Sequence, residues 1–333
     1  MAVAEPVRLA IIGCGDHAYE TLAPQLRWAP DNRLVAIADP RQDRLDRFSR
    51  FFRVDREYRD YRDLLADGGI DGVIVSVGHD EHPVIAEDAM RAGCQVFVEK
   101  SPCANAQQAR HVAQVQEETG RWTMVGWQRR FMPAFTMAQE ITRRPEFGRI
   151  HMFQSQINAG PYRDEDFYLV NHVVHHLDLA RYFMGTIEIA QVQRVTFNTN
   201  MFGCTISFRS AAGGIGTIQS GAFLDQSIPT ERTEILGNNR NIVVESFRHM
   251  RYNRPSNGQR SDGSPAGLVD SGDSLSWDQR HRFDPRTTYR GFEDEIHYFV
   301  SRVADGQMPS PDIADSIETM RLLDDVTERL KAA

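Results

Sequence analysis

The sequence predicts an α/β protein: a doubly wound parallel sheet at the N-terminus, followed by an α+β domain with a large, mostly antiparallel open sheet. Three observations support this prediction. A short apolar run at 7–12 ends in a glycine-rich turn. Apolar runs and helical segments then alternate up to about residue 126, a pattern typical of parallel sheets covered by helices. Beyond that point, long segments alternate polar and apolar residues, as in an antiparallel sheet with one polar face.

Composition agrees with two domains, which we expect at 1–125 and 126–333. The chain has 333 residues, is 41% hydrophobic and 25% charged, and carries a net charge of −8. This balance allows a sizeable core and predicts no nucleic-acid surface. No apolar run approaches the length of a membrane helix, and no leader pattern begins the chain. The four cysteines form no C-x-x-C pair, so we expect reduced thiols in a cytoplasmic protein.

The first turn has the form of a Rossmann dinucleotide-binding fingerprint. After the buried strand expected at 7–12, the sequence Gly13-Cys14-Gly15-Asp16-His17-Ala18 follows the pattern G-x-G-x-x-A and leads into a helical segment at 19–28. The first glycine permits a tight turn, and the second lets the backbone approach a pyrophosphate. N–H groups at the helix start can bind phosphates. An ordinary strand-to-helix turn has the same pattern, so other evidence is needed.

An acidic residue ends the next predicted strand, at 34–38. Asp39 follows Gly15 by 24 residues (39 − 15), near the usual spacing of about 20. An aspartate there accepts hydrogen bonds from both hydroxyls of an adenosine ribose and repels a 2′-phosphate. Arg41 lies two residues further on and could offset that repulsion. The sequence therefore favours NAD, with NADP possible.

Further candidate cofactor residues stand at the ends of later strands. Strands are expected at 72–77, 95–99 and 122–125, with a short extended piece near 57 and helices at 82–92 and 105–119. Ligands bind doubly wound sheets at the carboxyl ends of the strands. We therefore expect Gly13, Asp39, the segment from Ser76 through Val77 to His79, and Lys100 to converge on one crevice.

The second domain is expected to combine few helices with many strands. Helices are predicted at 133–142, 171–184, 289–304 and 312–330, and extended segments at 149–158, 188–199, 203–210, 215–220 and 231–236. A large sheet face without a helical partner in the sequence is often covered by another subunit, so we expect a homodimer or homotetramer. The segment 254–274 is rich in Gly, Ser, Pro and Asp and long for a connection. It is either a mobile surface loop or a lid or inter-subunit arm.

The helix expected from residue 171 carries a second chemical cluster. On a regular helix, Asn171, His175 and Asp178 share one face, and a histidine is a natural acceptor for the proton of an alcohol being oxidised. His172 and His176 have the i, i+4 spacing of a zinc pair. Without an H-E-x-x-H motif or a clear third ligand, we expect no metal. Buried structural histidines remain an alternative interpretation.

Several motifs in order resemble the glucose-fructose oxidoreductase / inositol dehydrogenase / rhizopine-catabolism (Gfo/Idh/MocA) family over nearly the whole chain. Val98-Glu99-Lys100-Ser101-Pro102 resembles the family's Glu-Lys-Pro signature, and residues 171–178 resemble its D-x-x-x-H-x-x-D helix. The resemblance implies NAD(P)-dependent oxidation or reduction of a secondary alcohol on a small-molecule polyol, sugar or cyclitol. Lys100 would stabilise alkoxide character, and His175 would exchange the proton. Asn171 departs from the family's usual aspartate and cannot carry a proton.

The predicted site has three groups of residues. The catalytic residues are Lys100 and His175. Substrate contacts are expected from Asn171, His176, Arg163, Tyr162 and Asn158. Cofactor contacts are expected from Gly13, Gly15, Asp16, His17, Asp39, Arg41, Ser76, Val77, His79, His82, Glu99, Lys100, Gln128 and Arg129.

Other activities fit parts of this pattern. They are a redox-neutral family member that uses bound NAD transiently during elimination or glycoside cleavage, a non-catalytic cofactor-binding sensor, an imine or dihydrodiol reductase, and a binding protein without turnover. The presence of both Lys100 and His175 argues against the sensor, because a sensor needs neither side chain.

Overall fold

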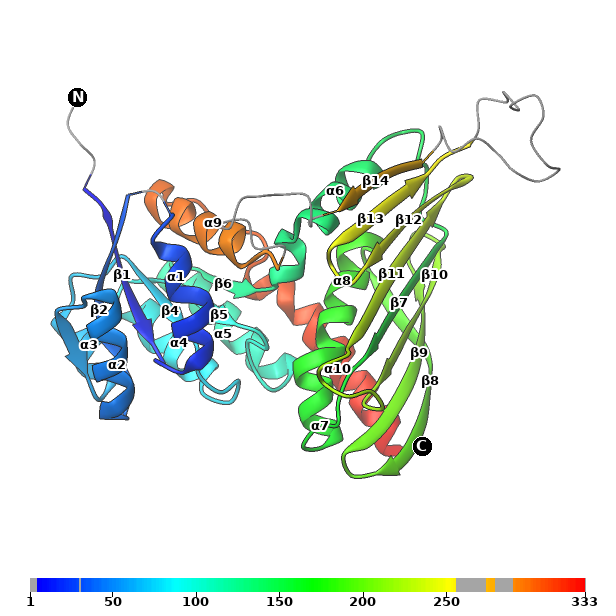
Figure 1. Ribbon diagram of the computed structural model, residues 1–333. Helices are drawn as coiled ribbons and strands as arrows, with labels where there is room; N and C mark the ends of the chain where they lie inside the picture. Colours follow the sequence, from blue (N-terminus) through cyan, green and yellow to red (C-terminus); the bar gives the residue numbers. More distant parts are fainter. Residues whose placement is uncertain (1–4, 30, 256–273, 279–289, 333) are drawn as a thin grey trace. The chain divides into compact units, whose positions relative to one another are not determined.

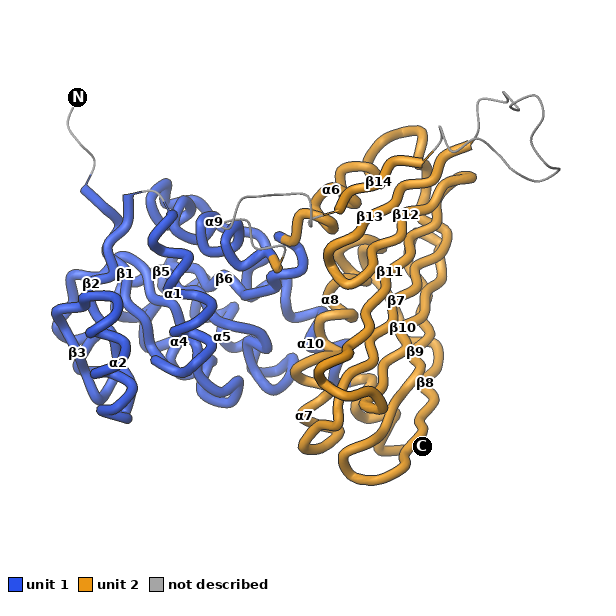
Figure 2. The backbone as a smooth tube through the Cα atoms, viewed as in Figure 1, with its two compact units in different colours: residues 1–131, 291–324 blue, residues 132–290, 325–333 orange. Residues whose placement is uncertain are grey.

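The computed structural model describes residues 5–29, 31–255, 274–278 and 290–332. Most of the predicted loop at 254–274 therefore lies outside the described residues. The chain forms two compact units (Figure 2). Unit 1 comprises Met1–Phe131 and Gly291–Asp324, and unit 2 comprises Met132–Arg290 and Asp325–Ala333. The division expected after residue 125 thus differs from these units mainly in the C-terminal segment 291–324, which folds with the N-terminal part of the chain.

Unit 1 is built on a six-stranded parallel sheet (Figure 1). Its strands are β1 (Val7–Ile12), β2 (Asn32–Ala38), β3 (Arg56–Tyr58), β4 (Gly72–Val75), β5 (Gln95–Glu99) and β6 (Thr123–Gly126). The order β3-β2-β1-β4-β5-β6 is that of the dinucleotide-binding Rossmann fold. β1, β4 and β5 are almost entirely buried, which explains their continuous apolar sequences. The predicted parallel, doubly wound sheet is confirmed.

The helical segments of unit 1 alternate with its strands; those at 42–52 and 61–67 were not predicted, and one irregularity follows the glycine turn. They are η1 (Ala18–Leu22), α1 (Ala23–Leu26), α2 (Gln42–Phe52), α3 (Tyr61–Asp67), α4 (His82–Arg91), α5 (Ala106–Thr119), η2 (Gln128–Phe131), α9 (Phe292–Asp305) and α10 (Ile313–Ala332), whose last residues belong to unit 2. η1 is a π-turn, where sequence periodicity predicts a regular helix. α5 begins where predicted, because the Asn105 side chain accepts the Gln108 N–H at 3.0 Å.

The C-terminal segment joins unit 1 because α9 completes its core. Phe299 is fully buried, with ring centroids 5.7 Å from Phe97 and 5.8 Å from Trp122. A side chain at Gly72 would collide with Leu9, Phe299 and Val303, so the glycine allows α9 to pack closely on the sheet. The apolar side chains of α9 thus pack against β1, β4 and β5 of the parallel sheet.

Unit 2 is dominated by an eight-stranded sheet (Figure 1). Its strands are β7 (Met152–Asn158), β8 (Ile187–Asn198), β9 (Met201–Ser210), β10 (Ile215–Gly221), β11 (Thr230–Gly237), β12 (Arg240–Glu245), β13 (His249–Asn253) and β14 (Ser274–Asp278). The order is β14-β13-β12-β11-β7-β10-β9-β8. β7 and β10 pair in parallel, and every other pair is antiparallel. The predicted, mostly antiparallel sheet is confirmed.

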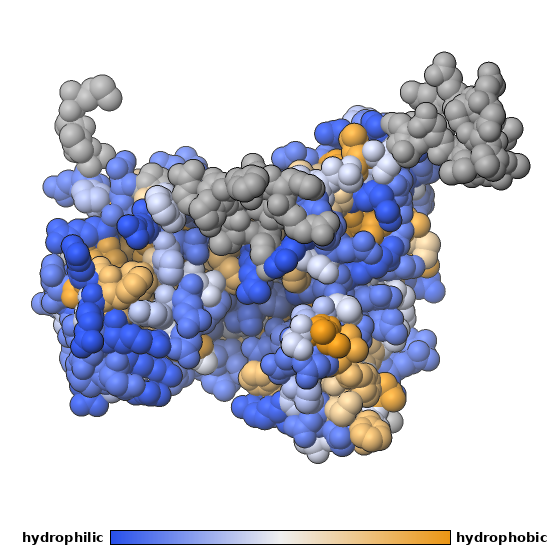
Figure 3. All heavy atoms as spheres, in the orientation of Figure 1, coloured by the Kyte–Doolittle hydropathy of each residue, from blue (hydrophilic) through white to orange (hydrophobic). Residues whose placement is uncertain are grey.

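One face of this sheet is covered by helices of the same unit. The helical segments are α6 (Pro133–Thr142), α7 (Glu165–Tyr168), η3 (Leu169–Val173) and α8 (Val174–Met184). α8 contacts β7, β8 and β10, while α6 contacts β12 and β13. Much of β8 is exposed, with Phe197 at 76% and Val195 at 57%. Figure 3 shows a mainly hydrophilic surface, with hydrophobic residues gathered on the lower part of unit 2 and in a smaller patch on unit 1.

Candidate active site

A cavity of about 640 Å³ opens at the carboxyl ends of β1, β2 and β4 in unit 1. Four of the predicted cofactor residues line it: Gly13, Asp39, Ser76 and Val77. Apolar side chains such as Val84 and Ile85 and polar ones such as Arg44 and Asp39 share its wall. A pocket of this size and mixed lining suits the adenosine part of a dinucleotide.

The glycine turn keeps this cavity open for a ligand backbone. Gly13 has a φ of +93°, and a Cβ there would lie 2.2 Å from the Ser76 carbonyl oxygen. Beyond its chain neighbours, an added Cβ at Gly15 would meet one atom of the described residues within 4 Å, Arg44 Nη1 at 3.9 Å. Gly13 is therefore required by the fold, whereas Gly15 leaves space beside the backbone. That space fits the pyrophosphate approach that the fingerprint assigns to the second glycine.

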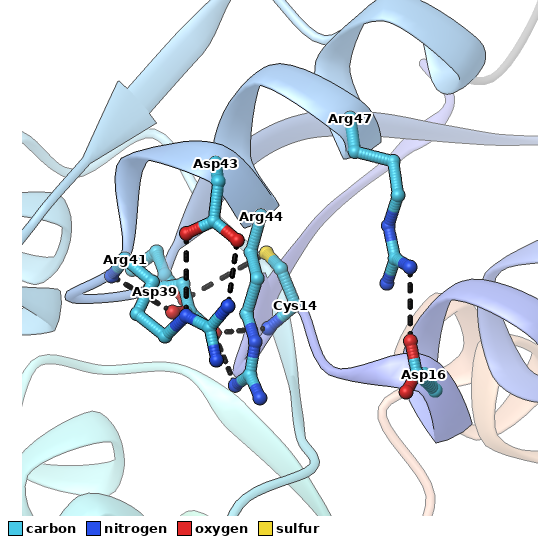
Figure 4. A network of polar contacts seen from close by, with 8 residues as sticks. Cys14, Asp16, Asp39, Arg41, Asp43, Arg44 and Arg47 are labelled. Atoms are coloured by element: carbon cyan, nitrogen blue, oxygen red, sulfur yellow. Dashed lines mark hydrogen bonds and ion pairs between the residues drawn. The ribbon is translucent and has the colours of Figure 1, made fainter.

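Asp39 is almost fully buried and is held by backbone donors (Figure 4). Its Oδ2 accepts the Cys14 N–H at 2.9 Å, and its Oδ1 accepts the Arg41 N–H at 2.9 Å. The Arg41 guanidinium turns away to Asp43, with contacts of 2.6 and 3.2 Å. Arg44 instead brings Nη1 to 3.4 Å from Asp39 Oδ2. The cation beside this carboxylate is thus Arg44, not the predicted Arg41.

The other two predicted residues of the glycine turn have different partners. Asp16 is exposed and binds Arg47 of α2 at 2.9 Å. His17 places Nε2 2.9 Å from Oε1 of Glu99, at the end of β5. Glu99 is buried, and its Oε2 accepts the Lys100 N–H at 3.1 Å. Burial alone would raise the pKa of Glu99, but the hydrogen bond from His17 and the positive charges of His17 and Lys100 lower it overall.

Lys100 follows β5 directly and is partly buried. Burial lowers the pKa of its ammonium group, against the opposing effect of Glu99, and Arg129 lowers it further. A lysine with a lowered pKa is typical of functional sites. Near it, His82 donates Nδ1–H to the Ser101 carbonyl at 2.8 Å, and burial lowers the pKa of His82 to about 4. His82 is therefore neutral at pH 7 and supports the backbone after Lys100.

The remaining predicted cofactor residues lie on nearby segments of unit 1. His79 follows β4 and has Nε2 3.4 Å from Asp80 Oδ1. Gln128 and Arg129 belong to η2, directly after β6, and Arg129 is buried. Both segments begin at carboxyl ends of sheet strands, on the edge where the cofactor residues were expected.

In unit 2, the predicted histidine helix has an irregular start. α7, the π-turn η3 and α8 follow one another without a break from Glu165 to Met184. Asn171 lies within η3, and its Nδ2 donates to the Phe167 carbonyl at 2.9 Å. His175 and Asp178 lie on the regular helix α8 and are buried. The expected one-face spacing therefore holds for His175 and Asp178, while Asn171 belongs to a turn of different geometry.

The other predicted substrate residues occupy three distinct environments. His176 is fully buried under the sheet, with Nδ1 2.5 Å from Ser155 Oγ, which favours a structural role. Tyr162 packs its ring 4.4 Å from the His172 ring and 4.9 Å from the Tyr168 ring. Arg163 is exposed and binds Asp164 at 2.7 Å. Asn158 ends β7, in register with Gly221 of β10.

Sequence reasoning missed several residues of the cavity wall. They are Arg44, Arg59, Tyr61 and Val84 among the lining residues. α2 was not predicted, although its apolar positions follow a helical period and Leu45 and Phe48 are its buried residues. Recognising that helix would have placed Arg44 on its first turn, three residues after Arg41, where a cation can reach the end of β2.

Two kinds of feature are absent from the described residues. Within residues 5–29, 31–255, 274–278 and 290–332, no three His, Cys, Asp or Glu side chains are grouped to hold a metal ion. In the same described parts of the chain, no helix combines the length and apolar character needed to cross a membrane.

Comparisons with known proteins agree with the fold and the glycine turn. Residues 7–127 match the profile described as "Oxidoreductase family, NAD-binding Rossmann fold" (GFO_IDH_MocA). The chain is 27% identical over 261 residues to scyllo-inositol 2-dehydrogenase (NAD(+)) of Bacillus subtilis (strain 168), covering 73% of this chain and 75% of that protein. It is 22% identical over 333 residues to inositol 2-dehydrogenase of Rhizobium meliloti (strain 1021), covering 96% and 95%.

Two solved structures illustrate the similarity of fold. A dehydrogenase from Chromobacterium violaceum has a TM-score of 0.86 at 19% identity, covering 98% of this chain and 95% of that chain. A levoglucosan dehydrogenase in complex with NADH has a TM-score of 0.82 at 18% identity, covering 98% of each chain. Identities this low are evidence for the shared fold alone.

Proposed function

We propose that the chain, which matches the Gfo/Idh/MocA model of NAD-binding oxidoreductases over residues 7–127 and is similar to inositol dehydrogenases, oxidises or reduces a secondary alcohol or ketone of a sugar, sugar derivative or cyclitol. The single observation that carries this proposal is Lys100, which stands partly buried, with a lowered pKa, directly after β5. A positioned cation is the group that hydride transfer from an alcohol needs near the developing alkoxide.

The residues of unit 1 fit NAD. The Cβ-free space at Gly15, the cavity beside Asp39 and the carboxylate held by backbone donors match the pyrophosphate and ribose of a dinucleotide. Bound NAD supplies the hydride acceptor, and NADH the hydride donor. Asp39 is proposed to accept hydrogen bonds from the adenosine ribose hydroxyls, and its negative charge to disfavour a 2′-phosphate.

Two side chains are proposed to handle the hydroxyl of the substrate. Lys100 donates a hydrogen bond to the reacting oxygen and stabilises its negative charge as the hydride leaves the carbon. His175 takes the hydroxyl proton during oxidation and returns it during reduction. Lys100 belongs to unit 1 and His175 to unit 2.

Substrate contacts are proposed from unit 2. Asn171 lies four residues before His175 in the same continuous helical segment. Tyr162 contacts that segment through the ring of His172. An amide and a phenol are suited to hydrogen-bonding several hydroxyl groups of a polyol. The named activities of the two curated relatives, both inositol dehydrogenases, support a cyclitol or sugar as the substrate class.

The test is a substrate scan with purified protein. NAD and a panel of inositols, sugars, aminosugars and anhydrosugars are mixed with the enzyme, and NADH formation is followed by its absorbance. We expect turnover with at least one polyol. Lys100→Ala should remove it while NADH binding persists. A folded, NADH-binding Lys100→Ala variant with normal turnover would refute the catalytic assignment.

We also propose a cytoplasmic homodimer or homotetramer assembled through the eight-stranded sheet. The support is the exposed surface of β8, where Val195 and Phe197 are open to solvent, and the four buried free cysteines. Light scattering on the full chain should give twice or four times the monomer mass. Phe197→Asp should shift that mass toward the monomer if β8 is in the interface.

A further inference from the structure

The carboxylate of Glu99 is buried, and Glu99 directly precedes Lys100 in the sequence. Its side chain is 7% exposed. Oε2 accepts the N–H of Lys100 at 3.1 Å, and Oε1 lies 2.9 Å from His17 Nε2. Glu99 therefore fixes the main chain at the proposed catalytic lysine with one oxygen and uses the other for a histidine of the glycine turn.

His17 stands where the interior of unit 1 meets solvent. It directly precedes the π-turn η1, and its side chain is 44% exposed. Its ring makes an edge contact with Phe292 of α9, with centroids 5.4 Å apart. Because Glu99 is a carboxylate, the imidazole Nε2 carries the hydrogen and donates it.

A buried carboxylate needs such a partner. Transfer of an isolated charge from water into a protein interior is unfavourable unless hydrogen bonds or an opposite charge compensate for it. At Glu99, the compensating groups are His17 and Lys100. Without the hydrogen bond from His17, the effect of burial on the pKa of Glu99 would dominate. Glu99 would then take up a proton at higher pH. A neutral Glu99 would no longer support the ammonium group of Lys100.

We propose that His17 is a positioning residue that holds the Glu99 carboxylate beside Lys100 and thereby sets how far activity persists as the solution is acidified. This inference rests on the proposed function, because it gives Lys100 a part in catalysis. It assigns His17 a role different from the predicted contact with the cofactor.

Other charged groups surround the His17–Glu99 pair. Those facing Glu99 or its lysine are Lys100, Arg129 and His82, and His79 faces His82. Those on the elements around His17 are Asp16, which binds Arg47, and the first turn of α9 with Glu293, Asp294 and Glu295. Only His17 makes a side-chain hydrogen bond to Glu99 among the contacts described for this carboxylate.

The direct test follows the ionisation of Glu99 without using turnover. The full chain is labelled with ¹³C at glutamate side-chain carboxyl carbons, and the Glu99 signal is assigned by its loss in Glu99→Gln. We expect the titration midpoint of this signal to move upward in His17→Phe. His17→Gln, which can still donate one N–H, should restore the midpoint toward that of the unaltered protein. An unchanged midpoint in a folded His17→Phe variant overturns the proposal.

A matched pair elsewhere in unit 1 supplies the control. His111 Nε2 also lies 2.9 Å from a carboxylate, Glu87 Oε2, but this pair is on the surface of α4 and α5. His111→Phe should leave the Glu99 signal and the pH profile of turnover unchanged. A shift of equal size in His111→Phe would mean that the effect is a general loss of charge, and it would overturn the assignment to His17.

Turnover provides the second readout. At pH 6, His17→Phe should lose roughly tenfold in kcat, the size expected for losing a hydrogen bond to a charged group, and should lose less at pH 8. In the Glu99→Gln background, the same change should alter kcat at pH 6 less than about twofold, since its partner is absent. A tenfold further loss in that background would overturn the coupling. If Lys100→Ala is fully active, the proposed function fails, while the carboxyl titration still decides the His17–Glu99 link.

Discussion

Replacing Asp39 tests how the cavity of unit 1 distinguishes NAD from NADP. The carboxylate is 3% exposed and is fixed by the backbone N–H groups of Cys14 and Arg41. A 2′-phosphate bound at the ribose would lie beside this fixed negative charge. We expect the unaltered protein to bind NADH much more tightly than NADPH, and Asp39→Asn or Asp39→Ser to remove most of that difference.

The size of the effect follows from Coulomb's law. Two unit charges about 4 Å apart interact by roughly 4 kcal/mol at an effective dielectric constant near 20, which corresponds to a factor of about a thousand in affinity. Arg44 Nη1 lies 3.4 Å from Asp39 Oδ2 and offsets part of this repulsion. We therefore expect a preference of at least about a hundredfold for NADH. Once Asp39 is neutral, Arg44 can pair with the phosphate, and the preference should fall to near unity or reverse.

The assay is fluorescence titration of NADH and NADPH, and two further variants identify the cation. Arg44→Ala added to Asp39→Ser should abolish most of the gain in NADPH affinity. Asp43→Ser frees Arg41 from its surface partner without changing Asp39, and should alter the ratio of affinities less than about threefold, as expected for an exposed pair. Tighter NADPH binding by the unaltered protein would refute the reasoning. A gain in NADPH affinity that survives Arg44→Ala but depends on Arg41 would also refute it.

Further predictions concern catalysis and stability. Lys100→Ala should lower kcat at least about a hundredfold with NADH affinity nearly unchanged, as measured by turnover and fluorescence. His175→Ala should abolish most turnover, whereas Asn171→Asp should keep it and move the acidic limb of the pH–rate profile upward, because a nearby carboxylate favours the protonated imidazole. Phe299→Ala should lower the free energy of unfolding by about 3–5 kcal/mol in urea titrations, and a loss below about 1 kcal/mol would contradict the role of α9 in the core of unit 1. Acidification should destabilise the protein as pH falls through the range between 6.5 and about 4, since burial lowers the pKa of His82 to about 4 and the unfolded chain binds the extra proton; His82→Asn should reduce this pH dependence.

The parallel sheet could be predicted closely because its strands are buried on both faces. β5 matches the predicted range 95–99, since a short apolar run between a glycine and a charged residue has few alternative interpretations. The C-terminal segment could not be assigned to its unit in the same way. α9 has an apolar stripe that fits any core, and only the packing of Phe299 against Phe97 and Trp122 decides which one. β12 and β13 were not predicted, although β11, β12 and β13 follow one another along the chain and pair as neighbouring antiparallel strands.

The sequence predicted which residues lie near the strand ends better than it predicted which side chains contact one another there. Gly13 and Asp39 lie where the fingerprint puts them, because strand ends and tight turns are local features. The choice between Arg41 and Arg44 depends on which guanidinium another carboxylate engages. Asp43 takes Arg41 in a two-point contact, and the position of Arg44 one turn into α2 leaves it beside Asp39. Competition among neighbouring charges of this kind is not visible in a linear pattern.

The two π-turns show where a regular period misleads for a physical reason. A π-turn holds one more residue than a turn of α-helix and shifts the phase of the side chains after it. One extra residue leaves the composition of the segment unchanged and does not interrupt its apolar stripe. The sequence pattern therefore still predicts a continuous helix. η1 directly follows His17, and η3 contains Asn171. Both irregular turns thus adjoin residues to which we give functional roles, in keeping with the expectation that local rules are broken where a side chain must be aimed at a partner and not at the core.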